Sequence, residues 1–261
     1  FANSIEDIAL VMSVISGKDE YDSTSKDIAV PDFQNSKGAD KKTKIGIPKE
    51  YFSEGLNPEV KSAIENQINN LSENSGVEFV DINLPHNEYS IATYYILTTA
   101  EASANLQRYD GVRYGYRDEK QTELDDMYVK TRSKGFGDEV KRRIMLGTYV
   151  LSSGYYDAYY TKAQKVRRLI KQDFENAFHK VDIILTPTSP TTAFKFGEKS
   201  TNPLEMYLND VYTTSANLAG IPGINIPIGK DSNDLPIGMQ LLANQFNEET
   251  LLQVAKLFNN H

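Results

Sequence analysis

Near the start of the chain, hydrophobic residues recur at steps of three and four positions, at Ile5, Ile8, Met12 and Ile15. This period is typical of an amphipathic helix with one buried face. Ser4 precedes the pattern as a helix cap, Asp7 stands at the capping-box spacing, and Gly17 is a natural stop. Residues 18–42 are polar and carry Pro31, so we expect them to run over the surface.

The next hydrophobic stretches predict a strand, a helix and a second strand. Residues 44–48 form a short apolar run, and residues 77–82 alternate with the period of two that is typical of a half-buried strand. Between them, a helix is expected to begin at Asn57-Pro58 and to end at Gly76, with the apolar stripe Val60, Ile64, Ile68 and Leu71. Such a unit builds a sheet that is covered by helices.

From Tyr94 to Phe178 the hydrophobic pattern is mainly helical. One part of it carries five basic residues, Lys162, Lys165, Arg167, Arg168 and Lys171. We interpret these residues as a solvent-exposed helix face, with a nucleic-acid contact as the alternative. A neighbouring cluster of tyrosines comprises Tyr155, Tyr156, Tyr159 and Tyr160. We interpret this cluster as a packing seam, with stacking on bases as the alternative.

Three further apolar runs, at residues 181–185, 224–228 and 237–242, predict strands. A helix then follows, with Asn247 as its cap and with Glu248 and Glu249 in its first turn. Strands that alternate with helices in this way indicate an α/β fold.

Composition narrows the class of protein. The 261 residues include 28 Lys and Arg against 36 Asp and Glu, which gives a formal net charge of −8. With 39% hydrophobic and 25% charged residues, the chain is typical of soluble globular proteins. An acidic chain is poorly suited to be the main binding surface for nucleic-acid phosphates, although a local contact with nucleic acid stays an alternative. No apolar run approaches the roughly 20 residues of a spanning helix, so we expect no membrane partner.

Cysteine and histidine offer little chemistry. The chain has no cysteine, which removes disulfides, thiolate metal sites and cysteine nucleophiles. Its three histidines, His86, His179 and His261, show no metal-ligand spacing. We interpret them as surface or capping residues, and we expect neither a metal site nor a Ser-His-Asp triad on this chain.

Four segments of the second half together carry a family resemblance. They are Thr186–Pro190, Asn217–Pro227, Leu235–Leu241 and Phe246–Leu252. In this order, and on these strand–turn–helix units, they resemble the C-terminal half of the amidase-signature family. The resemblance implies the amidase-signature fold, in which a mixed β-sheet is covered by helices. It also implies that residues 1–261 are the C-terminal portion of a single domain, without the N-terminal catalytic half.

Four other segments narrow the resemblance to one branch of that family. Ala102–Leu106, Arg108–Gly115, Gly135–Ile144 and Ser152–Tyr160 are similar to the A subunits of tRNA-dependent amidotransferases. These enzymes convert glutamate mischarged on glutamine tRNA, and in many organisms aspartate on asparagine tRNA, to the amide. The resemblance implies a cytoplasmic heterotrimer with B and C subunits as partners. ATP, Mg²⁺ and most contacts to the mischarged tRNA are then expected on the B subunit, with no cofactor on this chain.

The family's nucleophilic serine is not found in this chain. In the family it lies in a Gly- and Ser-rich signature of the N-terminal half, bridged by a second serine to a lysine base. The only Ser-Ser pair here, Ser152-Ser153, follows no glycine-rich loop, and small residues against a packed helix explain it. We therefore expect no catalytic residue on this chain, which would be the glutamine-recognition half and inactive alone.

Free glutamine is a zwitterion, so a selective pocket must satisfy its α-carboxylate and its α-ammonium at once. By resemblance, Arg143 binds the carboxylate, Asp210 binds the ammonium, and Tyr94 offers a hydroxyl that hydrogen-bonds the substrate. The residues alone leave plainer roles open. Two adjacent arginines such as Arg142 and Arg143 are usually surface charges. Asp210 could cap a helix or form a turn, and Tyr94 could be a core residue.

Two rival functions stay open. Another amidase-signature hydrolase of small amides would lack the zwitterion clamp and the partner subunits, so Arg143 and Asp210 favour the amidotransferase. A non-catalytic binding module with the same half of the fold is the second rival, and the missing serine favours it. If half of a shared sheet is absent, an apolar face or an unpaired strand edge should be exposed.

Overall fold

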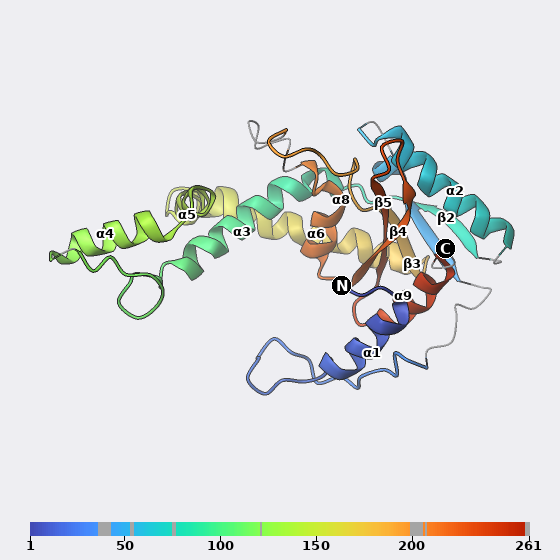
Figure 1. Ribbon diagram of the computed structural model, residues 1–261, viewed down its shortest axis with the longest axis horizontal. Coiled ribbons are helices and arrows are strands. Elements are labelled where there is room, and N and C mark those ends of the chain that lie inside the picture. Colours follow the sequence, from blue (N-terminus) through green and yellow to red (C-terminus); the bar gives the residue numbers. More distant parts are fainter. Residues whose placement is uncertain are drawn as a thin grey trace. The chain divides into compact units, whose positions relative to one another are not determined.

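The computed structural model describes residues 1–35, 43–52, 55–74, 77–120, 122–198, 206 and 208–258. The chain forms two compact units, and each is described by itself. Unit 1 comprises Phe1–Glu88 and Ile170–His261, and unit 2 comprises Tyr89–Leu169. Figure 1 labels their helices and strands.

Unit 1 is built on a five-stranded sheet with the strand order β2-β1-β3-β5-β4 (Figure 1). Strand β1 pairs in parallel with β2 and β3, whereas β5 pairs antiparallel with β3 and β4. All of β3 is buried, as expected for a central strand covered on both faces. The expected mixed sheet in an α/β fold is therefore confirmed. The strands are β1 (Lys44–Pro48), β2 (Glu78–Ile82), β3 (Ile183–Pro187), β4 (Gly223–Lys230) and β5 (Pro236–Ala243).

The helices of unit 1 enclose this sheet. Helices α2 and α9 contact several strands, and α1 packs on α9. The core contains side chains that are at most 1% exposed, among them Ile45, Ile64, Phe174, Leu185 and Leu241. The helices are α1 (Ile5–Ile15), α2 (Pro58–Asn74), α8 (Val211–Ala219) and α9 (Glu248–Ala255), with the 3₁₀ turns η1 (Lys49–Phe52), η2 (Asn87–Tyr89, which reaches the first residue of unit 2) and η4 (Lys256–Phe258).

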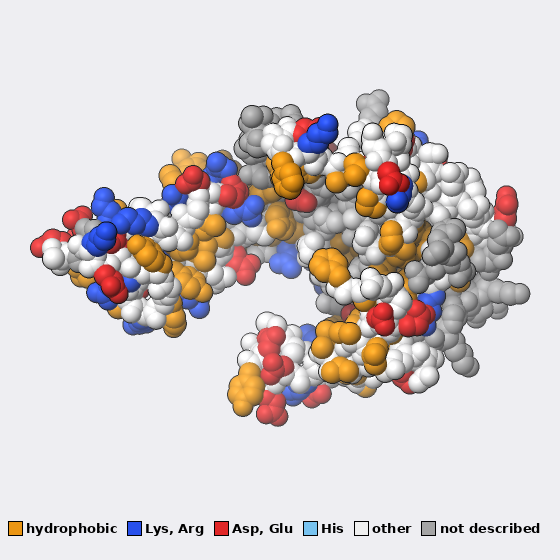
Figure 2. Space-filling view, in the orientation of Figure 1, with side chains coloured by type: hydrophobic (Ala, Val, Ile, Leu, Met, Phe, Trp, Pro, Cys, Tyr) orange, Lys and Arg blue, Asp and Glu red, His pale blue; other side chains and the backbone are white. Residues whose placement is uncertain are grey.

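Helix α1 has the predicted bounds but buries less of its stripe than the sequence predicts. Its cap is present, because the Asp7 amide donates to Ser4 Oγ at 3.1 Å. Ile5 is buried, whereas Ile15 is 74% exposed. Figure 2 shows hydrophobic side chains on the surface over this helix, where Leu10, Val11, Val14 and Ile15 are all at least half exposed. The helical period therefore predicts the element correctly but overstates how much of its apolar stripe is covered.

Unit 2 is helical, as the sequence predicts. Helices α3 and α5 approach closely at Gly147, where an added Cβ would lie 2.0 Å from the Thr99 carbonyl oxygen. The hydroxyls of Ser103 and Thr148 are hydrogen-bonded at 3.0 Å across the same contact. The elements are α3 (Ser90–Leu106), α4 (Leu124–Gly135), α5 (Asp138–Leu151), the π-helical turn η3 (Asp157–Thr161) and α6 (Lys162–Phe178), which continues into unit 1.

The basic residues and the tyrosine cluster of this region lie mostly at the surface, and the choice between these plain roles and a nucleic-acid contact stays a prediction. The basic residues Lys162, Lys165, Arg167 and Arg168 are exposed along α6, whereas Lys171 is half-buried and lies 3.9 Å from Glu175. The tyrosine rings pack on one another, with 4.2 Å between the ring centres of Tyr149 and Tyr155 and 5.1 Å between those of Tyr156 and Tyr160. None of the helices in the described residues is both long enough and apolar enough to cross a membrane.

Three predictions concern residues outside the described part of the chain. They are the helix end at Gly76, the role of His261, and residues 36–42 of the surface segment. Within residues 18–35, most side chains are exposed and no helix or strand forms, as expected.

Candidate functional site

Arg143 lies in the second turn of α5 with its side chain one-third exposed. Its Nε donates to Glu139 Oε1 at 3.0 Å, one helical turn earlier. Its Cζ atom lies 5.6 Å from the ring centre of Tyr95, a cation–π distance. In the described residues, no hydrogen bond joins its two Nη nitrogens to another residue. The guanidinium is therefore oriented on one side and open on the other.

The charge of Arg143 is secure in this setting. Partial burial alone would lower the pKa of its guanidinium, but the hydrogen bond and the negative charge of Glu139 outweigh burial and raise that pKa above its ordinary value. Glu139 also pairs with Arg142, which is more exposed than Arg143. Of the two adjacent arginines, Arg143 is the one that packs on an aromatic ring, and its role as a ligand of glutamine stays a prediction.

Tyr94 belongs to the same neighbourhood of unit 2. It lies on α3, half-buried, with its ring edge-on to Tyr95 at 5.3 Å between centres. The Tyr95 ring thus contacts both the Tyr94 ring and the Arg143 guanidinium, which places Tyr94 and Arg143 on two sides of one aromatic residue. The structure thus brings together two of the three residues that the sequence predicts for the site. Their neighbourhood depends on the close contact of α3 with α5.

Asp210 begins helix α8 in unit 1. Its carbonyl oxygen accepts hydrogen bonds from the Thr214 amide at 2.9 Å and from Thr214 Oγ1 at 2.7 Å. Its side chain is exposed and makes no capping hydrogen bond to the helix. The residue therefore occupies the cap position while its carboxylate stays available to a ligand. Because Asp210 and Arg143 belong to different units, their pairing stays a prediction.

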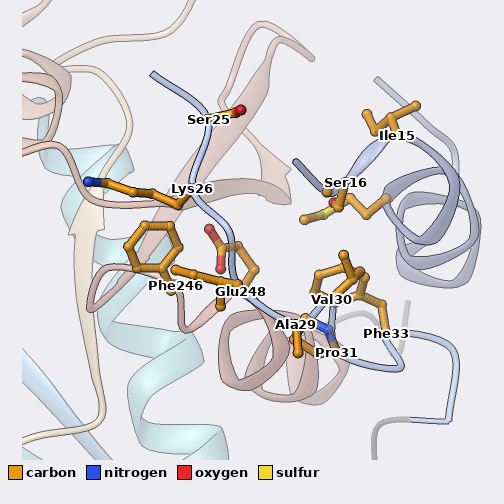
Figure 3. A pocket seen from close by; sticks show the side chains of 13 residues that line it. Ile15, Ser16, Ser25, Lys26, Ala29, Val30, Pro31, Phe33, Phe246 and Glu248 are labelled. Atoms are coloured by element: carbon orange, nitrogen blue, oxygen red, sulfur yellow. The ribbon is translucent and has the colours of Figure 1, made fainter. Parts of the chain in front are cut away.

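A cavity of about 260 Å³ in unit 1 does not include any predicted site residue. Figure 3 shows its lining, which comes from α1, from the segment that follows it, and from the chain around the start of α9. The lining is mostly hydrophobic, including Ile15, Val30 and Phe246, with Lys26 and Glu248 as its charged members. Because none of Tyr94, Arg143 and Asp210 lines this cavity, we assign the candidate site to those residues and not to the cavity.

Other sequence candidates have structural roles. His86 is held by Asp173, whose carboxylate accepts from the His86 amide at 2.8 Å and lies 3.0 Å from His86 Nδ1. His179 is exposed, as expected for a surface histidine. Ser152 ends α5 with its hydroxyl bonded to the Tyr149 carbonyl. Among the described residues, no group of three His, Asp or Glu side chains could hold a metal ion.

Two site residues were missed by the sequence analysis. Glu139 precedes Arg143 by four positions, so helical spacing alone could have indicated the ion pair. The sequence gives no reason to select Tyr95, whose ring centre lies 5.6 Å from Cζ of Arg143. The packing of α3 on α5 creates that contact, and no local sequence pattern predicts it.

Comparison with known proteins identifies close relatives. The family profile described as Amidase matches residues 1–252. The chain is 56% identical over 261 residues to the A subunit of glutamyl-tRNA(Gln) amidotransferase from Sulfurihydrogenibium sp., covering 100% of the chain and 53% of that relative. The protein of the same name from Fusobacterium nucleatum is 56% identical over 255 residues, covering 97% and 52%. The chain thus spans about half the length of the curated relatives it matches.

Solved structures show the same fold. The crystal structure of the glutamyl-tRNA(Gln) amidotransferase A subunit from Thermotoga maritima is 36% identical, with a TM-score of 0.75 and coverage of 98% of this chain and 50% of that one. A bacterial aryl acylamidase of the amidase-signature enzymes has a TM-score of 0.72 at 19% identity, with coverage of 98% and 51%. At that identity the second structure supports the fold alone.

Proposed function

The chain belongs to the amidase family and has the amidase-signature fold, and from this premise we propose that it recognises glutamine for a tRNA-dependent amidotransferase. The observation that carries the proposal is 56% identity along the whole chain to the A subunit of a glutamyl-tRNA(Gln) amidotransferase. The chain would supply the substrate-recognition part of the glutaminase component. The enzyme as a whole would hydrolyse glutamine and use the ammonia to amidate Glu-tRNA(Gln), and in some organisms Asp-tRNA(Asn).

In this proposal, Arg143 binds the α-carboxylate of glutamine. A guanidinium can place two parallel N–H donors on a carboxylate, which fixes both its position and its plane. Because Glu139 occupies only Nε, the Nη edge of Arg143 is left for the ligand. The half-buried Tyr94 would add a hydroxyl hydrogen bond from the neighbouring helix. This support is geometric and lies entirely within unit 2.

Asp210 would bind the α-ammonium group. An ammonium has three donors and needs acceptors, and the Asp210 carboxylate is exposed and not used as a cap. Holding both charges of the amino acid would fix where its side-chain amide lies. Such alignment raises the rate of attack by a nucleophile that is supplied elsewhere.

The reaction itself would use residues outside this chain. In serine amidases, a serine hydroxyl attacks the amide carbonyl, ammonia leaves, and water hydrolyses the resulting acyl-enzyme. The nucleophilic serine, the second serine and the lysine base would lie in the part of the protein that this chain does not span. The chain alone is therefore expected to be inactive, with binding and orientation as its contribution.

The partners follow from the same proposal. The B and C subunits would complete a heterotrimer in the cytoplasm, and ammonia would travel to the B subunit. There ATP and Mg²⁺ would serve to activate the carboxylate of the mischarged tRNA. The net charge of −8 agrees with an arrangement in which the B subunit makes most tRNA contacts.

The test compares two nitrogen sources in the intact complex. Arg143→Ala or Asp210→Asn should raise the KM for glutamine about 100-fold, because each substitution removes a charged contact worth about 3 kcal/mol. Amidation driven by added ammonium should stay near the wild-type rate, since it bypasses the glutamine pocket.

Arg142→Ala is the matched control for Arg143. It removes an adjacent guanidinium that also pairs with Glu139, but one that is more exposed than Arg143. Its glutamine kinetics should stay close to those of the wild type. If the Arg143 and Asp210 substitutions reduced ammonium-driven and glutamine-driven amidation equally, both residues would be structural and the proposed glutamine site would be wrong.

A further inference from the structure

Helix α8, which Asp210 begins, is held in unit 1 by a buried hydroxyl pair. Tyr51 in η1 is fully buried, and its Oη lies 2.5 Å from Ser215 Oγ, which is also fully buried. The Tyr51 hydroxyl also donates to Asn87 Oδ1 at 2.8 Å. Since a phenol has one proton to donate, the Ser215 hydroxyl is the donor in the first bond. Burial raises the pKa of Tyr51 far above its ordinary value, so its hydroxyl keeps that proton.

The other end of this chain of hydrogen bonds is itself fixed. Asn87 follows His86, whose backbone amide and ring nitrogen both contact the Asp173 carboxylate on α6. Asp173 is 8% exposed. The acceptor that holds the Tyr51 hydroxyl therefore lies in a turn that cannot move freely. A connected polar chain runs from α6 through this turn and Tyr51 to α8.

A second buried contact holds α8 from the sheet. Gln240 on β5 donates through Nε2 to the Tyr212 carbonyl oxygen at 3.2 Å and to Thr186 Oγ1 at 3.0 Å. The Tyr212 ring lies against the Tyr51 ring, with 5.2 Å between the centres. Polar contacts thus reach α8 at two successive turns, and their donors and acceptors are buried.

Directional hydrogen bonds of this kind fix the rotation and register of α8, which apolar packing alone does not fix. Hydrophobic contacts are non-directional, so a short helix can slide or rotate on an apolar surface at small cost. A buried hydroxyl that loses its partner is penalised, which ties the helix to one register. Ser215 follows Asp210 by five residues, or about 7.5 Å along the helix axis. A rotation of α8 would therefore carry the Asp210 carboxylate with it.

We propose that Tyr51 and Ser215 are positioning residues, which hold α8 in the register that presents the Asp210 carboxylate to the ammonium group of the substrate. The inference rests on the proposed function, because it takes Asp210 as a ligand of glutamine. It adds to that function a residue pair that touches no substrate. The pair acts through the placement of Asp210 at the N-cap, whose carbonyl oxygen accepts a hydrogen bond from Thr214 Oγ1.

The experiment is a double-mutant cycle in the intact amidotransferase complex. Tyr51→Phe and Ser215→Ala each remove one hydroxyl and should each raise the KM for glutamine about tenfold, which corresponds to about 1.4 kcal/mol. The double variant should be no worse than Tyr51→Phe, because Ser215→Ala removes a hydrogen bond that Tyr51→Phe has already removed. The kcat with saturating ammonium should stay at the wild-type value in all three.

Tyr212→Phe is the matched control. It removes a hydroxyl from the neighbouring ring, which keeps its contact with Tyr51, and no described residue is hydrogen-bonded to that hydroxyl. Its KM for glutamine should not change. The smaller Ser215→Ala change carries the test if Tyr51→Phe fails to fold.

Two results would overturn the inference. One is an unchanged KM for glutamine in Tyr51→Phe and in Ser215→Ala, and the other is an equal loss of glutamine-driven and ammonium-driven amidation, which marks a general structural role. The proposed function is tested separately by Asp210→Asn. If that substitution selectively impairs glutamine use while Tyr51→Phe and Ser215→Ala do not, only the positioning role fails. If Asp210→Asn has no selective effect, the proposed function fails first.

Discussion

Unit 1 and unit 2 divide the chemistry of the chain unequally. All eight arginines and 12 of the 16 tyrosines lie in unit 2, which has 14 basic and 10 acidic side chains. Unit 1 has 14 basic side chains, all of them lysine, against 26 acidic ones. The formal charges are therefore +4 and −12, which together give the −8 of the whole chain.

This division of charge follows the division of proposed roles. The basic unit 2 carries Tyr94 and Arg143, which would bind an anion, and the acidic unit 1 carries Asp210, which would bind a cation. The net positive charge of unit 2 favours binding of the α-carboxylate there, and the net negative charge of unit 1 favours binding of the α-ammonium. Each residue assigned by resemblance thus lies in a unit of suitable charge.

The units also differ in how they are stabilised. Unit 1 has a sheet whose central strand is wholly buried. Unit 2 has no strand among the described residues and depends on helix contacts and on polar anchors, such as the 2.5 Å ion pair of Lys134 with the buried Asp118. We therefore expect unit 1 to respond most strongly to a lost apolar side chain, and unit 2 to a changed helix spacing.

The largest effect is expected in the core of unit 1. Leu241→Ala removes a side chain that is fully buried on β5 and should lower the free energy of unfolding by about 2–5 kcal/mol. Urea denaturation followed by circular dichroism measures this change. Leu146→Ala in unit 2 is the control, because Leu146 is half exposed, and it should change stability by no more than about 0.5 kcal/mol. Similar losses for the two variants would break the contrast between the units.

A smaller effect is expected where α3 meets α5. Gly147→Ala places a Cβ 2.0 Å from a backbone oxygen of α3, so the helices must separate, at a cost of about 1–3 kcal/mol. Because Tyr94 and Arg143 lie on these two helices, the KM for glutamine should rise as well. Gly154→Ala, whose Cβ would meet nothing within 4 Å, should leave the KM unchanged. Unaltered stability and KM in Gly147→Ala would mean that the close contact matters for neither.

The smallest effect concerns the carboxylate beside Arg143. Glu139→Gln keeps an acceptor for Nε but removes a negative charge near the proposed carboxylate site, so the KM for glutamine should fall about twofold. Glu139→Ala removes the acceptor too, and it should raise the KM because the guanidinium loses its orientation. Steady-state kinetics of both variants measure whether the KM for glutamine changes in opposite directions. An increased KM in Glu139→Gln would show that the negative charge of Glu139 favours glutamine binding and does not repel the carboxylate of the substrate.

Much of the fold follows from local pattern. The period of two around Phe79 and the cap at Ser4 predict elements that the structure contains at nearly the same bounds. The exposure of Ile15 was not predictable, because helical period shows which residues share a face but not how far a neighbour covers it. The antiparallel pairing of β3 with β5 likewise joins segments about 50 residues apart without a hairpin signal.

The site is less accessible from sequence than the fold. Composition alone gives no reason to choose Arg143 over Arg142, and only the spacing of the family resemblance selects Arg143, whose contact with Tyr95 no local pattern predicts. The hydrogen bond of Tyr51 with Ser215 joins residues 164 positions apart. Tertiary packing creates such contacts, and neither residue type nor local period encodes them.

The most direct test of the central claim changes the ligand and the protein together. Competition against glutamine would be measured for 4-carbamoylbutanoate, which lacks the α-ammonium, and for 4-aminobutanamide, which lacks the α-carboxylate. Wild-type enzyme should reject both. Asp210→Asn should lose its preference for glutamine only over the first analogue, and Arg143→Ala only over the second. If either variant lost both preferences equally, or kept both, Arg143 would not bind the α-carboxylate and Asp210 the α-ammonium of the same glutamine molecule.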